Sequence, residues 1–540
     1  MPPGSPNFRA RAQTITRKRI RAWRGFFEST GKAFEPSALP PPDFTPEVKK
    51  PSPSTTRYPI DRAAFAKLKE ASYTARKLIK RESVISEDKL NSGPATAEPG
   101  DVTVATEPAV DVATFAPSLN FPGISATGML PPDCTLAVGP DHLLGAVNSS
   151  IAVFDRSGGA PLLAQTLKAW FSDLDVIEGA TIFDPKALFD QHAGRWVLLA
   201  VAVAKEPDRA WFVLSISKTA DPLGEWHSYA LDSTVDGSEK TNNWADFPAL
   251  GVDAQALYLT GNMFRFGAGF EYAKIRIVPK EAAYAGDALG FTDLVQLKNS
   301  NGSMAFTVQP CHTFGAPQVQ YLVNTIYPDT ETPETKLSLW SITDPLGDSP
   351  VLSLRTIEVS PYFLPPDSIQ QGEPNPLDSG DVRVLNAVFR GGSVWCAFCT
   401  VHNWDEETNV AAIHWVQIEA ASGVLIQQGI YGAESANYSF PAVMPNNNGD
   451  LLMVFSRCSA TEFASIGFTG RKAADPIGEL RNSSILKAGA AGYLSLDGNG
   501  RNRWGDYAGI ASDPANPATV WFFSLFAVPG AWSTWIGSAS

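Results

Sequence analysis

The sequence predicts an all-β fold: a seven-bladed β-propeller preceded by a mostly disordered, basic N-terminal extension that contains one helix. Three observations lead to this prediction. The 540-residue chain contains 43 Gly, 42 Pro and 14 Trp, a composition typical of many short antiparallel strands joined by turns. A pair of strand-like runs recurs throughout residues 118–540. Its starting positions lie 51–72 residues apart, an interval that fits the four short strands of one propeller blade.

A shorter repeat supports the same architecture. The pattern Asp-Pro-Leu/Ile-Gly occurs at residues 221–224, 344–347 and 475–478. Pro at the second position and Gly at the fourth fit a type I turn. Because the first two copies follow alternating apolar runs, this turn is predicted to join the third and fourth strands of a blade.

The part of the chain before the repeats has a different composition. Residues 1–90 contain 19 Lys and Arg against 9 Asp and Glu, whereas residues 91–540 contain 24 against 47. We predict a disordered, basic and Pro-rich arm over 1–58, an amphipathic helix over 59–83, and a linker over 84–117. Such an asymmetry is typical of an interaction tail. The alternatives are contact with an anionic partner (nucleic acid, anionic lipid or the acidic body itself) and a solvated leader.

The same region bears on targeting. The basic start is not followed by an apolar core and a cleavage site, so the sequence predicts no recognisable secretory signal peptide. No run of 18 apolar residues occurs, which predicts no membrane-spanning helix. We expect a monomer.

The last blade needs a strand from elsewhere. Its predicted third strand ends at Ile536, and only four residues follow. A propeller closes its ring because an open end leaves a strand edge unpaired. We predict that residues 102–105, a strand-like piece of the linker, supply the outermost strand of this blade, and that the propeller domain spans 118–540.

The residues that open the seven repeats are the first candidates for chemistry. They are Asp133, Asp184, Asp246, Gln309, Asp381, Ser439 and Asp506. The first strand of a blade lines the central channel, so five carboxylates are expected near its mouth. Carboxylates so close together must be protonated, paired with a cation, hydrogen-bonded or bound to a metal ion. Lys186 and Arg383 follow their aspartates by two residues, on the same strand face.

Three interpretations of these carboxylates stay open. Asp133, Asp246 and Asp506 are candidate ligands of Ca²⁺, which prefers hard oxygen donors. A pair taken from Asp184, Asp246, Asp381 and Asp506 is a candidate for general acid/base catalysis. The structural interpretation is that each aspartate caps backbone N–H groups between adjacent blades, because a catalytic group is needed only once whereas this residue repeats.

Residues that break the repeat are the candidates for ligand binding. They are Trp244, His312, Arg503, Trp504 and Tyr507. Arg383, two residues after Asp381, is a further candidate for ligand binding. An arginine can clamp an anionic group, and an exposed Trp or Tyr can stack on a sugar ring. The alternative for Trp504 is packing between blades.

Two segments carry a resemblance to a known group of proteins. The run from Arg503 to Gly509 (RWGDYAG) with Asp513-Pro514, and the run Phe183-Asp-Pro185, resemble largely uncharacterised bacterial seven-bladed β-propeller proteins near the sialidase-like (BNR/Asp-box) superfamily. The likeness covers about residues 120–540 and implies an exported or extracellular protein. Thr219 to Trp226 keeps the Asp-to-Trp spacing of a sialidase Asp-box, but the two other copies lack the Trp and no Phe-Arg-Ile-Pro run is present. No catalytic residue is therefore carried over.

The sequence favours a binding or interaction protein that holds a small-molecule or glycan ligand, or a metal ion, at an acidic channel mouth. The alternative is a sialidase-like glycoside hydrolase in which a channel carboxylate acts as acid/base and Arg383 or Arg503 holds an anionic sugar. The absent sialidase motifs favour binding. Whether the protein is an enzyme stays open at this point.

Overall fold

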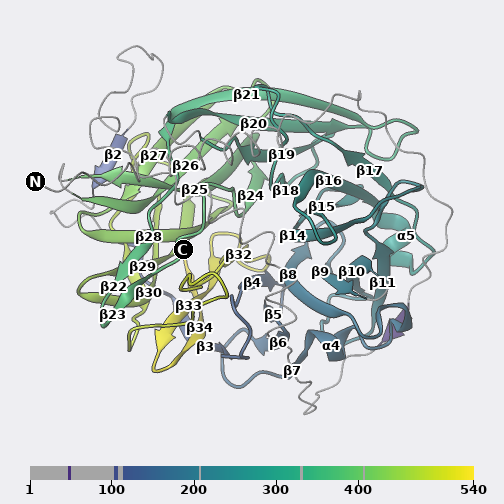
Figure 1. Ribbon diagram of the computed structural model, residues 1–540, viewed down its shortest axis with the longest axis horizontal. Helices are drawn as coiled ribbons and strands as arrows, with labels where there is room; N and C mark the ends of the chain where they lie inside the picture. Colours follow the sequence, from purple (N-terminus) through teal and green to yellow (C-terminus); the bar gives the residue numbers. More distant parts are fainter. Residues whose placement is uncertain (1–46, 50–102, 107–113, 206–207, 329–331, 405–407) are drawn as a thin grey trace, which may run out of the picture.

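The computed structural model describes residues 47–49, 103–106, 114–205, 208–328, 332–404 and 408–540 (Figure 1). The predicted helix over 59–83 and nearly all of the basic arm lie outside these residues. The described chain is built almost entirely of β-strands, and its sheets follow one another around the molecule in chain order. The predicted fold class, an all-β propeller, is confirmed.

The described strands can be grouped into seven antiparallel sets of four, which is consistent with the number of blades predicted. Blade 1 contains β4 (Thr135–Val138), β5 (His142–Val147), β6 (Ser150–Asp155) and β7 (Leu163–Thr166). Blade 2 contains β8 (Thr181–Asp190), β9 (Arg195–Ala204), β10 (Arg209–Ser217) and β11 (Trp226–Asp232). Blade 3 contains β14 (Asn243–Val252), β15 (Ala256–Arg265), β16 (Phe270–Pro279) and β17 (Thr292–Val295).

The remaining blades follow the same order. Blade 4 contains β18 (Gln309–Thr313), β19 (Val319–Thr325), β20 (Glu334–Thr343) and β21 (Val351–Tyr362). Blade 5 contains β24 (Ala387–Arg390), β25 (Ser393–Asn403), β26 (Asn409–Glu419) and β27 (Leu425–Gly432). Blade 6 contains β28 (Ala436–Pro445), β29 (Leu451–Ser459), β30 (Glu462–Arg471) and β31 (Ser484–Lys487). Blade 7 contains β32 (Gly509–Ser512), β33 (Val520–Val528), β34 (Ala531–Ala539) and β3 (Leu119–Ser125). Parallel pairing of β18 with β14 and β24 also joins the third, fourth and fifth sets into one 13-stranded sheet.

The ring closes through β3, which pairs antiparallel with β34 near the C-terminus. In Figure 1 the blue β3 lies beside the yellow β34. The prediction that residues 102–105 close the ring is wrong, because β2 (Thr103–Thr106) pairs parallel with β27, the outer strand of blade 5. As the outer strand of blade 7, β3 also packs against blade 1. Its Phe121 is 6% exposed, and the Phe121 ring lies 6.0 Å from that of Phe154 in blade 1.

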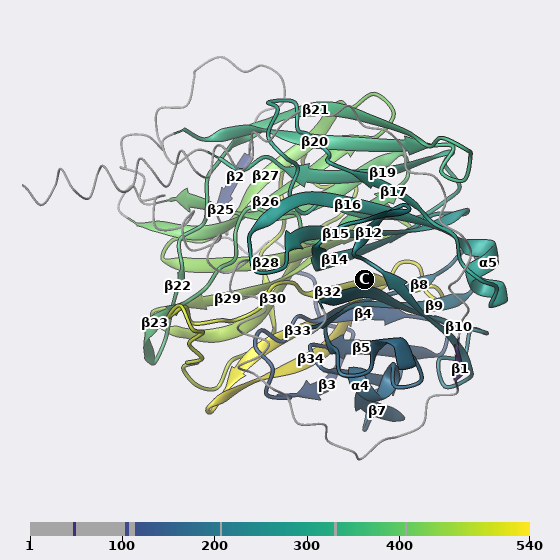
Figure 2. The same ribbon diagram turned by 45° about the vertical axis from the view of Figure 1, so that its right-hand side comes forward.

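Short elements lie outside the seven sheets. β1 (Glu47–Lys49) pairs antiparallel with β11, so two segments of the N-terminal region add strands to outer edges of blades. Helix α5 (Lys280–Ala285) lies at the outer margin of the ring in both views (Figures 1 and 2). The other short elements are α4 (Leu167–Trp170), the 3₁₀ turn η1 (Asp175–Ile177), β12 (Val235–Asp236), β13 (Glu239–Lys240), β22 (Ser368–Gln370) and β23 (Glu373–Leu377). No helix within the described ranges combines the length and apolar character needed to cross a membrane.

A backbone conformation repeats where the chain enters a blade. Five non-glycine residues there have left-handed φ angles of 51–54°, and a glycine takes the place in blade 5. These residues are Asp133, Asp184, Phe247, Thr307, Gly380 and Phe440. In blades 2, 3 and 6 a β-bulge accompanies this residue. Left-handed backbone is uncommon for non-glycine residues, so each needs support from its surroundings.

The hydrophobic core lies mainly between adjacent blades. One cluster joins blades 2 and 3 through residues such as Phe212 and Trp244, and another joins blades 1 and 2 through Val153 and Trp196. Each blade therefore depends on its neighbours for burial of its apolar faces, as expected for a radially repeated fold.

Candidate functional site

The centre of the ring is filled by basic side chains stacked on aromatic rings. The Lys186 amino nitrogen lies 3.0 Å from the centroid of the Tyr507 ring and 5.5 Å from that of Phe247. The Arg383 guanidinium carbon lies 4.4 Å from the Phe247 centroid. Phe247 and Tyr507 meet edge to face at 5.7 Å. These side chains come from the entries to blades 2, 3, 5 and 7, so they fix the inner ends of distant blades relative to each other.

Most of the predicted channel carboxylates are bound to protein groups. Asp381 forms an ion pair with Arg383 at 2.6 Å, and Asp506 forms one with Arg503 at 2.9 Å. Asp133 accepts a hydrogen bond from the side chain of Asn148. Asp246, on β14, is 1% exposed. Arg383 and Arg503 are thereby engaged by carboxylates of the protein, and the structure does not present them as clamps for an anionic ligand.

Side chains of one blade hold the left-handed residue of the next. Asn148 Oδ1 accepts the N–H of Asp184 at 2.7 Å, and Asp184 Oδ2 accepts the N–H of Phe247 at 3.2 Å. In the same way, Asn262 Oδ1 accepts the N–H of Thr307 at 2.7 Å, and Cys399 Sγ accepts the N–H of Phe440 at 3.3 Å. Asp184 is thus a cap between blades, the structural interpretation of the repeated aspartates, although asparagine and cysteine fill the same place elsewhere.

We expect Asp184→Ala to lower the free energy of unfolding by about 1–3 kcal/mol, because the buried N–H of Phe247 then loses its acceptor. Asp184→Asn keeps an acceptor oxygen and is expected to lose less. Urea denaturation followed by tryptophan fluorescence measures both, with Asp348→Ala at an exposed position as the control. An Asp184→Ala variant as stable as the parent protein would show that the cap contributes nothing.

The predicted Ca²⁺ site is not found. Within the described ranges no three His, Cys, Asp or Glu side chains gather into a group that could hold a metal ion. Asp133, Asp246 and Asp506 therefore do not form one. Their backbone positions also differ: Asp133 is itself the left-handed residue of its blade, whereas Asp246 precedes the left-handed Phe247.

The aromatic side chains that were predicted to bind a ligand are buried in the core. Trp504 is 1% exposed and donates from Nε1 to Ser456 Oγ at 3.0 Å. Trp244 is 2% exposed and packs 5.7 Å from Phe264. In contrast to the prediction, the structure offers neither indole to a ligand, and Trp504 follows the alternative of packing between blades. Tyr507 is also buried and donates to the carbonyl oxygen of Pro185 at 3.0 Å.

His312 lies beside the channel but is held by its neighbours. Its Nε2 is 2.8 Å from Gln191 Oε1, and its ring stacks on Phe314 at 4.5 Å. Burial lowers the pKa of His312 to about 3, so the ring is neutral at physiological pH. A neutral, hydrogen-bonded and stacked imidazole has a structural role here.

Lys186 is a basic residue buried at the channel. Burial lowers the pKa of its amine to about 7, although Asp133, Asp184 and Asp506 oppose this effect. The cavities near it are small: one of about 80 Å³ is lined by Lys186, Tyr507 and His312, and one of about 10 Å³ by Arg383 and Asp506. Such volumes fit a few water molecules but not a sugar ring.

A much larger cavity lies between blades 5 and 6 and is here called the blade 5–6 cleft. Its volume is about 640 Å³, within the range of small-molecule sites. Its lining includes Phe314, Arg390, Trp395, Gln417, Gln427, Arg471 and Asp475. Phe314 follows β18, so blade 4 also contributes to its rim.

The amides of the cleft form a connected chain. Gln427 donates to Gln417 Oε1 at 2.5 Å, and Gln417 donates to Ser393 Oγ at 3.0 Å. The N–H of Gly478 donates to Gln427 Oε1 at 3.0 Å. These bonds hold the amide groups in fixed orientations beside the indole of Trp395, which is 5% exposed.

Two guanidinium groups also line the cleft. Arg390 lies 3.7 Å over the Phe314 ring and donates to the carbonyl oxygen of Pro445 at 2.6 Å. Arg471 donates to the carbonyl oxygen of Asp475 at 2.7 Å. The Asp475 carboxylate is taken by Arg481, with contacts of 2.7 and 2.8 Å.

The cleft could not be predicted from the sequence, because its lining combines strand residues with residues at turns from two blades. Arg390 belongs to the Arg-Gly-Gly turn of the fifth repeat, and Asp475 begins the third Asp-Pro-Leu/Ile-Gly copy. An arginine in each of two neighbouring blades, both beside turns, was the available signal. Only the adjacency of blades 5 and 6 brings them to one cavity.

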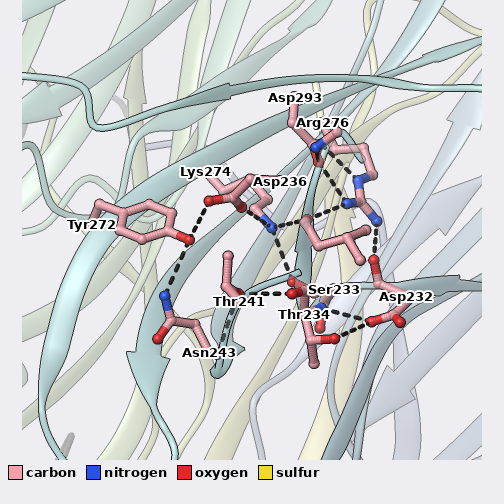
Figure 3. A network of polar contacts seen from close by, with 12 residues as sticks. Asp232, Ser233, Thr234, Asp236, Thr241, Asn243, Tyr272, Lys274, Arg276 and Asp293 are labelled. Atoms are coloured by element: carbon pink, nitrogen blue, oxygen red, sulfur yellow. Dashed lines mark hydrogen bonds and ion pairs between the residues drawn. The ribbon is translucent and has the colours of Figure 1, made fainter. Parts of the chain in front are cut away.

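A separate cluster of buried charges lies in blade 3 and lines none of these cavities (Figure 3). Arg276 and Asp293 form an ion pair at 2.7 Å, with both side chains 0% exposed. Lys274 contacts Asp236 at 2.7 Å, and Tyr272 donates to the same carboxylate at 2.6 Å. The cluster fastens the segment between β11 and β14 to β16, which is a structural role.

No family model matches the sequence, and no curated protein matches it. Solved structures that match over most of the chain are found at low identity. A point mutant of the NanB sialidase from Streptococcus pneumoniae is 12% identical, with 79% of this chain and 71% of that chain covered and a TM-score of 0.37. The α-L-arabinofuranosidase Arb93A from Fusarium graminearum is 8% identical (79% and 98% covered, TM-score 0.35). The WD40 domain of SCAP from fission yeast is 9% identical (76% and 86% covered, TM-score 0.32).

Proposed function

We propose that this protein is a β-propeller binding protein that takes a small polar ligand of the glycan class in the blade 5–6 cleft. The observation that carries the proposal is the cleft itself: a cavity of about 640 Å³ lined by the half-buried Phe314, the small exposed part of the mostly buried Trp395, and fixed hydrogen-bonding groups. Glycan sites combine an aromatic surface for the sugar ring with polar side chains for its hydroxyl groups. Gln417 and Gln427 supply such groups.

This proposal moves the ligand away from the channel mouth, where the sequence analysis placed it. Asp381 and Asp506 are paired with Arg383 and Arg503, and the cavities at the channel axis are of about 80 and 10 Å³. A monosaccharide needs more space than either. The cleft has the volume that a sugar requires, whereas the packed side chains of the channel hold the blades together.

Binding is favoured over hydrolysis by the carboxylates of the cleft. A glycoside hydrolase of the usual kind needs two carboxyl groups about 5–9.5 Å apart across the scissile bond. The described residues that line the cleft include one carboxylate, that of Asp475, and not a pair. Hydrogen bonds from Arg481 hold the pKa of Asp475 below its usual value. A carboxylate that is ionised and engaged by Arg481 is a poor proton donor to a leaving group.

The test is ligand binding to the full chain and to a matched pair of variants. A panel of monosaccharides and short oligosaccharides is screened by saturation-transfer NMR, and the ligands found are titrated by calorimetry. Gln417→Ala is expected to weaken binding about tenfold, because the variant loses one or two hydrogen bonds to the sugar. Gln255→Ala, at an exposed position outside the cleft, is expected to leave the affinity unchanged.

Two results would contradict the proposed function. One is the absence of any sugar in the panel that binds more tightly than about 10 mM. The other is a ligand whose affinity is the same in Gln417→Ala as in the parent protein, which would place its site elsewhere.

A further inference from the structure

The blade 5–6 cleft has a charge opposite to that of the propeller around it. Residues 91–540 contain 24 Lys and Arg against 47 Asp and Glu. Yet the cleft contains Arg390 and Arg471, and within the described ranges neither guanidinium forms an ion pair. The carboxylates of Asp475 and Asp450 act on Arg471 and oppose the effect of burial on its pKa, but they are already paired with Arg481 and Lys472. The cleft therefore keeps an excess of positive charge, which an anionic ligand would balance.

Arg471 provides the stronger of the two observations. It is the last residue of β30, and its side chain is 3% exposed. Its Nη2 donates to the carbonyl oxygens of Asp475 and Pro476, at 2.7 and 3.3 Å. Its Nε is buried and has no hydrogen-bond partner among the described residues. A buried, charged donor without an acceptor is costly, and an anionic group in the cleft removes this cost.

Arg390 reaches the cleft from the neighbouring blade. It contacts the carbonyl oxygen of Pro445 at 2.6 Å and Ser512 Oγ at 3.3 Å, both uncharged acceptors. Phe314 lies 3.7 Å beneath its guanidinium carbon and fixes its plane. Burial lowers the pKa of Arg390 to about 10, so the group still carries its charge at neutral pH. The cleft therefore has two oriented cations on blades 5 and 6.

We infer that the ligand of the blade 5–6 cleft is an acidic sugar, whose carboxylate or phosphate group is held by Arg471 and Arg390 and whose ring lies toward Trp395. This inference rests on the proposed function and adds the charge of the ligand to it. A guanidinium presents parallel donors that match a carboxylate or a phosphate in two-pronged contacts. Neutral sugars satisfy the amides but leave the buried donor of Arg471 unmatched.

The experiment compares glucuronate, glucose 6-phosphate and glucose by calorimetry at low ionic strength. Both acidic sugars share the ring of glucose, and the two distinguish carboxylate from phosphate recognition. At least one acidic sugar is expected to bind at least about tenfold more tightly than glucose. Arg471→Gln and Arg390→Gln are each expected to remove most of this preference, because each weakens binding of the acidic sugars much more than it weakens binding of glucose. Arg265→Gln, at a side chain that is 55% exposed in blade 3, is the charge-matched control.

The outcomes separate this inference from the proposed function. Glucose that binds as tightly as both acidic sugars would overturn the inference and leave the glycan site in place, whereas no binding by any sugar would overturn both. Arg471→Lys keeps the charge without the two-pronged geometry and is expected to retain only part of the preference. If Arg471→Gln does not fold, the test relies on Arg390→Gln and on the loss of affinity with added salt. A preference for acidic sugars that is unchanged in Arg390→Gln and also insensitive to salt would contradict the inference.

Discussion

Asp293→Ala is expected to lower the free energy of unfolding by about 3–5 kcal/mol, because it leaves the guanidinium of Arg276 buried without its counter-ion. The two side chains are 0% exposed. Arg276 donates from Nε and Nη2 to the two oxygens of Asp293, each at 2.7 Å, as Figure 3 shows. Phe291 lies 3.5 Å from the guanidinium carbon, so water has little access to the charge once the carboxylate is gone.

The loss extends beyond the ion pair. Asp293 also accepts the N–H of Gly237 at 2.9 Å, and Arg276 donates to the carbonyl oxygens of Asp232 and Val235 at 2.7 and 3.0 Å. These contacts fasten the connection between blades 2 and 3. Asp293→Ala is therefore expected to loosen this connection before the blades themselves unfold.

Urea denaturation followed by tryptophan fluorescence measures the effect, and hydrogen exchange of residues 233–241 locates it. The double variant Arg276→Met/Asp293→Leu removes both charges and is expected to recover much of the stability lost in Asp293→Ala. Asp287→Ala, at an exposed position, is the control. A change of less than about 1 kcal/mol in Asp293→Ala would mean that water or a rearranged side chain compensates Arg276.

The fold was predictable because each strand pair, with the turn between its strands, can be recognised from a short stretch of sequence. The Asp-Pro-Leu/Ile-Gly turns do fall between third and fourth strands: β10 ends at Ser217 and β11 begins at Trp226, and the copies in blades 4 and 6 lie likewise. β3 was missed because Pro122 and Gly123 interrupt its strand pattern. Such residues are tolerated at the outer edge of a sheet, but that the segment forms an edge strand is known only once the ring closes.

The candidate site was less predictable, for two physical reasons. The acidic residues that open the repeats were aligned by side chain, whereas what repeats is a left-handed backbone residue that can be Asp133, Phe247 or Gly380. Side-chain chemistry is free to vary where a backbone conformation is the common requirement. The cleft depends on Arg390 and Arg471, which are distant in sequence and meet only because blades 5 and 6 are neighbours.

The free energy of unfolding is expected to rise by about 2 kcal/mol between pH 7 and pH 9 through Lys186 alone. Burial lowers the pKa of this amine from its ordinary 10.5 to about 7. Between these two values the unfolded chain holds a proton that the folded chain has released, so stability increases with pH at up to about 1.4 kcal/mol per unit. Below pH 7 both states are protonated and the dependence ends. The carboxylates of Asp133, Asp184 and Asp506 face the amine and oppose the shift without reversing it.

Lys186→Met tests this prediction, because methionine keeps an unbranched apolar side chain without a charge. Urea denaturation of the parent protein and of this variant at pH 6, 7, 8 and 9 gives both slopes, with Lys336→Met, whose side chain is 42% exposed in the parent, as the control. The variant is expected to lack the rise above pH 7 that the parent and the control share, and to gain most relative to the parent at pH 6. Equal slopes in all three proteins would mean that Lys186 keeps its proton in the folded state. The three carboxylates would then outweigh burial, and the channel would be held by an ion cluster instead of a neutral amine stacked on Tyr507.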